Sequence, residues 1–595
     1  MIMMKNSKAV NKVVLFVMAL MLPACSKVDF QKMETGKPYT GICQGKDCAV
    51  VFDQVAEGNV KGRAYLAGDD LAVTPIAFSS DIRNSGNGQV WIEGNQMKLK
   101  LSQKEGELQV KLGATSFSLK PQGDDTLAFK AMYMEPVSEI AKEYGRVYAH
   151  DVPGYWASYP ETNEDFGTIY INKVSDLALS KDLNLDMDIY YPKVPAIRPR
   201  PLLLLIHGGA YYNGDKQAVG YPEMGQHFAE RGYVVASINY RLGFKPLAAD
   251  VDRAGYRGLQ DANAAVRYLL ANAEEFGIDT SMVFAAGTSA GAITALNLAF
   301  MREENRPECT REGGVKSGIS KVVKGTFKAL DWMAEKVGLH TNLDGQDVCE
   351  ALGLNSDLGP IEGVNPDIPQ SFKVKAVVNM WGAVHDLGML KNSKETAVLS
   401  IHGDADRIVP YSYGYPFDQV LEPFEDDILR SIPDFMGPMV EWMLPHITDG
   451  KPLNEWAFNP MYGSSQIHDK ATTLGMRSVL QTCPNGGHSL HVNDDGTLSE
   501  YFYDVILPNM TRFLGEAAVG GIVVKLGVPN GQWFEAAGTD NVAELHWQVE
   551  GGAVVGGNGS KAKVLLFGDA PKHTVAVCGK YDNGVEFRET WEEEE

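Results

Sequence analysis

The sequence predicts an α/β domain, with a mostly parallel sheet covered by helices on both faces, and a small all-β domain on either side of it. Short apolar runs alternate with helical stretches over residues 131–516, which is the pattern of the α/β class. Two-residue alternation of apolar and polar side chains marks residues 26–130, and strand and turn signals return over 517–595. The 595 residues also exceed one hydrophobic core, which stops growing at about 250 to 300 residues.

The composition and charge of the chain limit the partners and substrates that we expect. The chain is 44% hydrophobic and 22% charged, as in an ordinary globular protein. Its net charge of -22 would repel nucleic-acid phosphates and anionic lipids, and no local basic patch offsets that charge. We therefore expect no nucleic-acid partner and a neutral substrate.

Residues 1–25 have the pattern of an export signal. Three lysines precede the apolar run 13–22, which is too short to span a bilayer stably. The tetrapeptide LPAC that ends at Cys25 resembles the bacterial lipobox, which implies lipidation of Cys25 and membrane anchoring through it. In that pattern Ser26 favours the outer membrane. A plain secretory signal with a chance cysteine, giving a periplasmic or secreted protein, is the alternative.

Six more cysteines suggest disulfide bonds, because their number is even and the chain is predicted to be exported. The sequence does not fix the connectivity, although Cys43 with Cys48 and Cys309 with Cys349 are the favoured local pairings. No second pair of Cys or His ligands follows at zinc-like spacing, so we expect no metal and no cofactor.

The two flanking segments have short, evenly spaced strands. Alternation over 97–101, 108–112 and 117–120 predicts a small barrel or sandwich. Near the C-terminus, alternation over 545–549 and glycine-containing turns predict a compact β-sandwich. That segment weakly resembles the immunoglobulin-like and polycystic-kidney-type accessory domains of exported bacterial enzymes.

The central segment has nearly continuous apolar runs, which are typical of parallel strands buried on both faces. They cover residues 202–206, 233–238, 282–286, 374–378 and 398–401. An alternating run at 183–189 predicts a half-exposed strand near the start of the sheet, and residues 258–275 predict a helix.

A candidate nucleophile follows one of these strands. The pentapeptide Gly287-Thr288-Ser289-Ala290-Gly291 fits G-x-S-x-G, a pattern that is weak by itself. Here the apolar strand 282–286 runs into it and a helix-forming stretch, 290–301, runs out of it. This strand-turn-helix setting is what a nucleophile elbow requires, because the tight turn lifts the serine hydroxyl above the sheet. The alternative is that Ser289 lies in a turn with a structural role only.

The stretch His207-Gly208-Gly209-Ala210, after strand 202–206, resembles the oxyanion loop of hormone-sensitive-lipase-like and type-B carboxylesterases. These families belong to the α/β-hydrolase superfamily, and the resemblance covers roughly residues 150–515. It implies that the backbone amides of Gly209, Ala210 and Ala290 stabilise the oxyanion. The family usually has glycine where this chain has Ala210.

The base and acid of such a fold follow the serine in the order Asp or Glu, then His. His488, in the segment PNGGHS, is the expected general base, with His491 as its rival. The segment 402–410 matches the pattern HGxxDxxVP of these hydrolases and places the acid at Asp406, with Asp404 as the alternative.

Two insertions interrupt the central domain after strands that end at the active-site face. Residues 302–372 carry a helical apolar stripe over 319–337, and residues 411–465 carry a methionine-rich one over 428–443. Both are candidate lids.

These features predict a serine esterase that hydrolyses small-molecule or polymer-borne carboxylic esters through an acyl-serine intermediate. A serine peptidase of the prolyl-oligopeptidase type is one alternative, although a long β-propeller would precede its hydrolase domain. An adhesion protein on an inactive hydrolase scaffold is the other. The identity of the ester is not determined by the sequence.

Overall fold

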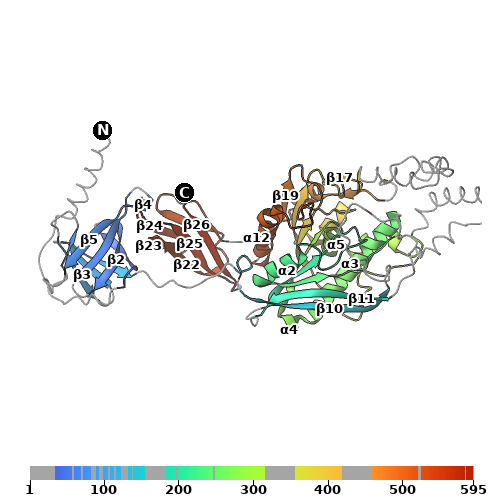
Figure 1. Ribbon diagram of the computed structural model, residues 1–595, viewed down its shortest axis with the longest axis horizontal. Coiled ribbons are helices and arrows are strands. Elements are labelled where there is room, and N and C mark those ends of the chain that lie inside the picture. The colour runs from blue at the N-terminus through green and yellow to red at the C-terminus, as the bar shows by residue number, and fades with distance from the viewer. Residues whose placement is uncertain are drawn as a thin grey trace, which may run out of the picture. The chain divides into compact units, whose positions relative to one another are not determined.

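The computed structural model describes residues 34–593 except 44, 57–58, 69–70, 82–88, 93–97, 105–106, 113–114, 122–131, 137, 154–181, 194–198, 245–247, 315–355, 419–454, 456–457, 520–523 and 583. Cys25, the signal segment and both apolar lid stripes lie outside the described residues. The chain forms two compact units, one of Met1–Met132 with Gly521–Glu595 and the other of Tyr133–Gly520 (Figure 1). Among the described residues, no helix is both long enough and apolar enough to cross a membrane.

The N-terminal strands close into a barrel, so the structure decides between the barrel and the sandwich that the sequence left open. Closure comes from antiparallel pairing of the first strand with the last, which leaves no free edge. Tyr39, Phe52 and Phe78 pack edge to face inside it. The barrel strands are β1 (Pro38–Cys43), β2 (Lys46–Ala56), β3 (Asn59–Leu66), β5 (Ile76–Asp81), β6 (Gln89–Ile92), β7 (Lys98–Lys104), β8 (Glu107–Leu112) and β9 (Thr115–Pro121).

The C-terminal strands form two sheets that pack face to face. Phe534 and Leu566 of one sheet share a buried cluster with Val575 of the other. The first sheet contains β20 (Lys525–Leu526), β21 (Trp533–Ala537), β24 (Lys561–Phe567), β23 (Gly552–Asn558) and the short β4 (Ala72–Val73). The second contains β22 (Val542–Glu550), β25 (Thr574–Tyr581) and β26 (Glu586–Glu592).

The barrel and the sandwich share a core, although the sequence reads as two separate domains. Strand β4 leaves the barrel and pairs in parallel with β24. Tyr65 of the barrel stacks on Phe567 with ring centroids 3.8 Å apart, and its hydroxyl donates to Asp569. Arg63 adds an ion pair to the same carboxylate. Buried apolar and charged contacts thus hold the chain's first and last β segments together.

The second unit contains an eight-stranded sheet in the order β10-β11-β13-β12-β14-β15-β16-β19. The pairs β10–β11 and β11–β13 are antiparallel, and the other neighbours are parallel. The strands are β10 (Ile140–Pro153), β11 (Asp182–Pro192), β12 (Arg200–Ile206), β13 (Val234–Ile238), β14 (Ile278–Thr288), β15 (Val374–Met380), β16 (Ala397–Gly403) and β19 (Ser478–Cys483). A short pair, β17 (Tyr413–Gly414) and β18 (Met461–Tyr462), lies outside this sheet.

Helices cover both faces of the sheet, as the sequence predicts. Leu202, Leu204 and Ile206 of β12 join the core that contains α3 and α5, whereas the alternate Leu203 and Leu205 are equally buried outside that cluster. Side chains alternate across a strand, so apolar layers contact both faces. The α-helices are α2 (Tyr221–Glu230), α3 (Ala248–Ala271), α4 (Ala273–Phe276), α5 (Ala290–Phe300), α11 (Ser464–Thr473) and α12 (Leu507–Ala518).

Three local expectations need correction. The helix expected at 258–275 begins at residue 248 and breaks after 271, and α12 continues two residues beyond the boundary expected at 516. Asp188, expected on an exposed face of β11, is buried because Gly145 N and Gln217 Nε2 donate to its carboxylate and Lys216 lies 3.7 Å away. Polar partners from other segments stabilise the buried carboxylate of Asp188.

The expected disulfide bonds are not found among the described cysteines. Cys309 and Cys483 have free thiols, so the pairing of Cys309 with Cys349 is wrong. The Cys48 thiol donates to Gly41 O at 3.4 Å, and the side chain of Cys43 lies outside the described part of the chain. Cys48 and Cys578 are buried in strands β2 and β25, where a cysteine packs as a small apolar side chain.

Candidate active site

The turn from β14 into α5 places Ser289 at the carboxyl end of a central strand. Ser289 has φ 52°, a left-handed conformation that costs free energy in a residue with a Cβ. A side chain at Gly291 would overlap the Ile206 carbonyl oxygen, and one at Gly287 would overlap the Gly291 backbone. The two glycines of the pentapeptide are therefore required by close backbone approach, and this turn has the geometry of a nucleophile elbow.

The structure brings Ser289, His488 and Asp406 together from three loops at the same edge of the sheet. His488 Nε2 lies 3.0 Å from Ser289 Oγ, and His488 Nδ1 lies 2.7 Å from Asp406 Oδ2. The serine and the histidine are 199 residues apart in sequence. These are hydrogen-bond distances for a nucleophile, a base and an orienting acid.

Neither rival residue occupies this arrangement. His491 is half-buried and packs against Trp381, with ring centroids 5.2 Å apart. Asp404 is exposed, and its Oδ1 accepts from Asn485 N at 2.6 Å, which braces the loop that carries His488. Asp404 is thus a loop residue in this structure.

Asp406 has a buried set of donors that sequence reasoning missed. His402 Nε2 lies 3.1 Å from Asp406 Oδ2, and His402 Nδ1 contacts Ser464 Oγ at 2.7 Å. Asn379 Nδ2 donates to the same serine oxygen at 3.0 Å. His402 is the first residue of the HGxxDxxVP pattern, so a signal for it was present. No local sequence pattern marks Asn379 or Ser464, which lie in strand β15 and helix α11, respectively.

The carboxylate form of Asp406 is strongly favoured. Burial raises the pKa of this group, but hydrogen bonds from His402 and His488 lower it further and hold it well below its ordinary value. The amides of Ile408 and Val409 donate to Oδ1 at 2.8 and 3.1 Å. An ionised Asp406 therefore faces His488 and fixes the tautomer that carries its proton on Nδ1.

The loop after β12 lies beside this elbow. A Cβ at Gly208 would sit 3.4 Å from Ser289 Cβ, and one at Gly209, where φ is 101°, would overlap the Asn213 carbonyl oxygen. Ala210 has φ 53°, so the alanine that departs from the family pattern takes a conformation that glycine adopts without cost. The amides of Gly209 and Ala210 donate to no described residue.

Ser289, Ala290 and Ala210 line one mostly apolar pocket, which encloses about 780 Å³ including its open mouth. Apolar lining comes from α3, α5 and the stems of both insertions. These lining residues are Tyr211, Val251, Tyr256, Ile293, Met301, Pro307, Ile408, Val409, Pro416, Phe417, Phe458 and Met461. A concave apolar pocket beside the serine suits the hydrophobic part of a substrate.

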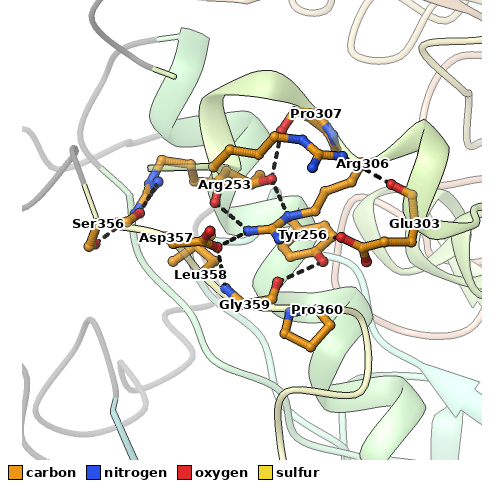
Figure 2. A network of polar contacts seen from close by, with 12 residues as sticks. Arg253, Tyr256, Glu303, Arg306, Pro307, Ser356, Asp357, Leu358, Gly359 and Pro360 are labelled. Atoms are coloured by element: carbon orange, nitrogen blue, oxygen red, sulfur yellow. Dashed lines mark hydrogen bonds and ion pairs between the residues drawn. The ribbon is translucent and has the colours of Figure 1, made fainter. Parts of the chain in front are cut away.

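Figure 2 shows a network of polar contacts that includes Tyr256 and Pro307, two residues that line the pocket. Arg306 lies over the Tyr256 ring, 5.2 Å from its centroid, and pairs with Asp357. The Tyr256 hydroxyl donates to Gly359 O at 2.9 Å, and Arg253 donates to Ser356 O at 3.0 Å. The two ends of the insertion whose middle, 315–355, is not described are thus fastened to α3.

Parts of the chain are similar to known esterases. The family model described as BD-FAE matches residues 187–397. Gut esterase 1 of Caenorhabditis elegans is 35% identical over 116 residues, which are 19% of this chain and 20% of that protein. Esterase LipC of Mycobacterium tuberculosis is 25% identical over 146 residues, which are 24% of this chain and 34% of that protein. The matches thus span about a fifth to a third of these relatives.

Solved structures of esterases are also similar to this chain. A truncated carbohydrate esterase from gut microbiota covers 64% of this chain and 98% of its own, at 16% identity and a TM-score of 0.32. Thermogutta terrifontis esterase 2 phosphorylated by paraoxon covers 57% and 90%, at 15% identity and a TM-score of 0.30. With the sheet order, the elbow and the matched region all in place, residues 133–520 form an α/β-hydrolase domain flanked by all-β segments.

Proposed function

We propose that this protein is a serine carboxylesterase with Ser289 as nucleophile, His488 as general base and Asp406 as orienting acid. The observation that carries this proposal is the continuous hydrogen-bonded set from Ser289 Oγ through His488 to Asp406, with Ser289 lining a mostly apolar pocket. The names of the curated relatives, which are esterases, support the choice of ester as substrate.

Each step follows from the geometry. Ser289 Oγ attacks the ester carbonyl carbon while His488 Nε2 takes its proton, and Asp406 stabilises the imidazolium that forms. The amides of Gly209, Ala210 and Ala290 stabilise the oxyanion of the tetrahedral intermediate. His488 then gives the proton to the leaving alkoxide, which leaves an acyl-serine. In deacylation His488 takes a proton from water, which attacks the acyl carbon. His488 then gives that proton to Ser289 Oγ as the acyl–serine bond breaks, which releases the acid and restores the serine hydroxyl.

The substrate of this enzyme is a neutral carboxylic ester, carried on a small molecule or on a polymer. The apolar pocket favours an uncharged group, and the net charge of -22 disfavours polyanions. A peptidase with a propeller before its hydrolase domain is less suited to this chain, since the described residues 34–121 contain a single closed barrel.

Two measurements test the proposal. A fluorophosphonate probe is expected to label the parent protein and not Ser289→Ala, with the two proteins melting at the same temperature. The parent is expected to hydrolyse nitrophenyl esters and to leave peptide substrates intact. Absence of labelling would point to an inactive scaffold, and turnover of peptides with none of esters would point to a peptidase.

We further propose that the chain is an exported lipoprotein anchored in the cell envelope, at the outer membrane, through Cys25. The lysine-rich start, the apolar run 13–22 and the LPAC tetrapeptide support this location.

A further inference from the structure

One acidic side chain lines the mostly apolar pocket. Asp252, in the first turns of α3, lines the same pocket as Ser289. Only 14% of its side chain is exposed. A carboxylate in such a place is unfavourable unless other groups pair with it.

Asp252 has two partners, and both also line the pocket. Asn459 Nδ2 donates to Asp252 Oδ2 at 2.7 Å, and His385 Nε2 lies 3.3 Å from Asp252 Oδ1. His385 Nδ1 faces Pro460 O at 3.4 Å. Asp252 and His385 thus meet side by side in the lining of the pocket.

This pair has capacity for a further hydrogen bond. An ionised carboxylate accepts about four hydrogen bonds; Asn459 donates one to Asp252 Oδ2, and His385 Nε2 lies 3.3 Å from Oδ1. Burial raises the pKa of Asp252 above its ordinary value, and His385 and Asn459 offset only part of that rise. A donor that enters the pocket and reaches Asp252 would therefore relieve part of the unfavourable burial.

We propose that Asp252 and His385 form a polar subsite that binds a hydroxyl group on the part of the ester that enters the pocket. The proposal rests on the esterase function and specifies its substrate class: a neutral ester with a hydroxyl group beyond an apolar segment. The carboxylate accepts the hydroxyl proton. A purely apolar substrate would leave the carboxylate facing hydrocarbon.

The same contacts also hold structure together, and the test must separate the two roles. Asn459 follows the insertion whose residues 419–454 are not described, so its bond to Asp252 fastens the end of that insertion to α3. A purely structural role would change stability and leave the choice between substrates unaltered. A subsite role would change the preference of the enzyme between substrates.

The experiment uses pairs of esters that differ by one group. Ethyl ω-hydroxyhexanoate and ethyl heptanoate differ by a hydroxyl in place of a methyl on the acyl side, and ω-hydroxyhexyl acetate and heptyl acetate do so on the alcohol side. The parent protein is expected to favour the hydroxyl member of one pair by about tenfold or more in kcat/KM. The pair that shows the preference identifies which side of the ester occupies the pocket.

Three variants complete the test. Asp252→Leu is expected to reverse the preference, and Asp252→Asn, which keeps the shape but is a weaker acceptor, to reduce it severalfold. Asn459→Ala removes the clamp and keeps the carboxylate, so it is expected to melt earlier with the preference retained. A parent ratio at or below one for both pairs overturns the proposal, and so does a parent-like ratio in Asp252→Asn. Failure of the esterase function itself looks different: no ester is hydrolysed and no probe labels Ser289.

Discussion

His402 donates to the same carboxylate oxygen of Asp406 that orients His488. His402 Nε2 and His488 Nδ1 lie 3.1 and 2.7 Å from Asp406 Oδ2. Ser464 Oγ contacts His402 Nδ1, and Val409 O contacts the same Nε2 that faces Asp406, so the protein holds both ring nitrogens of this histidine. We interpret His402 as a positioning residue for the catalytic acid.

His402→Gln is expected to lower kcat by up to about a hundredfold with little change in KM, because a small displacement of Asp406 misaligns His488. Steady-state kinetics on a nitrophenyl ester measures both constants. Ser464→Ala, one bond farther from Asp406, is the graded control and should cost less. An unchanged kcat in His402→Gln would show that Asp406 is held by its loop amides alone.

Asp406→Asn is expected to lower kcat by about four orders of magnitude, because the amide favours the wrong histidine tautomer. Asp404→Asn should lower it less than tenfold, since Asp404 only accepts from Asn485 N. The two aspartates are two positions apart in the same loop, and the variants are measured side by side. The reverse order of the two losses would assign the acid to Asp404.

His491 is expected to make the protein less stable in acid. Burial first, and repulsion from His488 second, lower the pKa of His491 to about 4 from 6.5. Between these two pH values the unfolded chain therefore binds more protons than the folded one. The stability that neutral His491 contributes is complete above pH 6.5 and is lost as the pH falls through about 4. The loss amounts to about 3 kcal/mol at most.

Urea unfolding at neutral pH and at about pH 4.5 measures that loss, and His491→Phe is the matched variant because it keeps an aromatic ring against Trp381. The free energy of unfolding of the variant should vary less between the two pH values than that of the parent. Its esterase activity at neutral pH should persist. Loss of activity with normal stability would restore His491 as the rival base.

Gly291→Ala is expected to abolish activity and lower the melting temperature, because the added Cβ would overlap the Ile206 carbonyl oxygen beneath the elbow. Gly258→Ala is the control within α3: its Cβ would meet its neighbours at an ordinary 3.5 Å, and alanine is a better helix former. Thermal melts and probe labelling report both effects. Equal behaviour of the two variants would contradict the requirement for close approach at the elbow.

Lipidation of Cys25 is tested in the host cell. The exported parent protein should partition into detergent, and its mass should show a modified N-terminus at Cys25. Cys25→Ser should block processing or release the protein into the aqueous phase. An unmodified N-terminus downstream of Cys25 would support plain secretion.

Much of the catalytic site was predictable because its signals are local. The apolar strand, the two glycines and the following helix lie within about twenty residues of Ser289, and backbone sterics alone demand that pattern. The HGxxDxxVP segment likewise marked Asp406. The fold class followed from strand and helix periodicity, which depends on each segment's own residues.

Other features depend on segments that meet only in the folded chain. Barrel closure at β1 and β9 and the burial of Asp188 required partners distant in sequence. Asp252 has no neighbour in sequence that marks it as a pocket residue, and its partners come from more than a hundred residues away.

The sequence by itself thus determined the α/β class, the elbow at Ser289 and the candidate acid and base. Apolar periodicity and glycine sterics depend on residues that are close together in the sequence. The tertiary structure alone decided that His402 shares the carboxylate with His488, that Asp252 and His385 meet in the pocket, and that Cys309 remains a thiol. These contacts form between polar groups that are distant in sequence and meet only when the chain packs. Short-range sequence patterns therefore do not predict them.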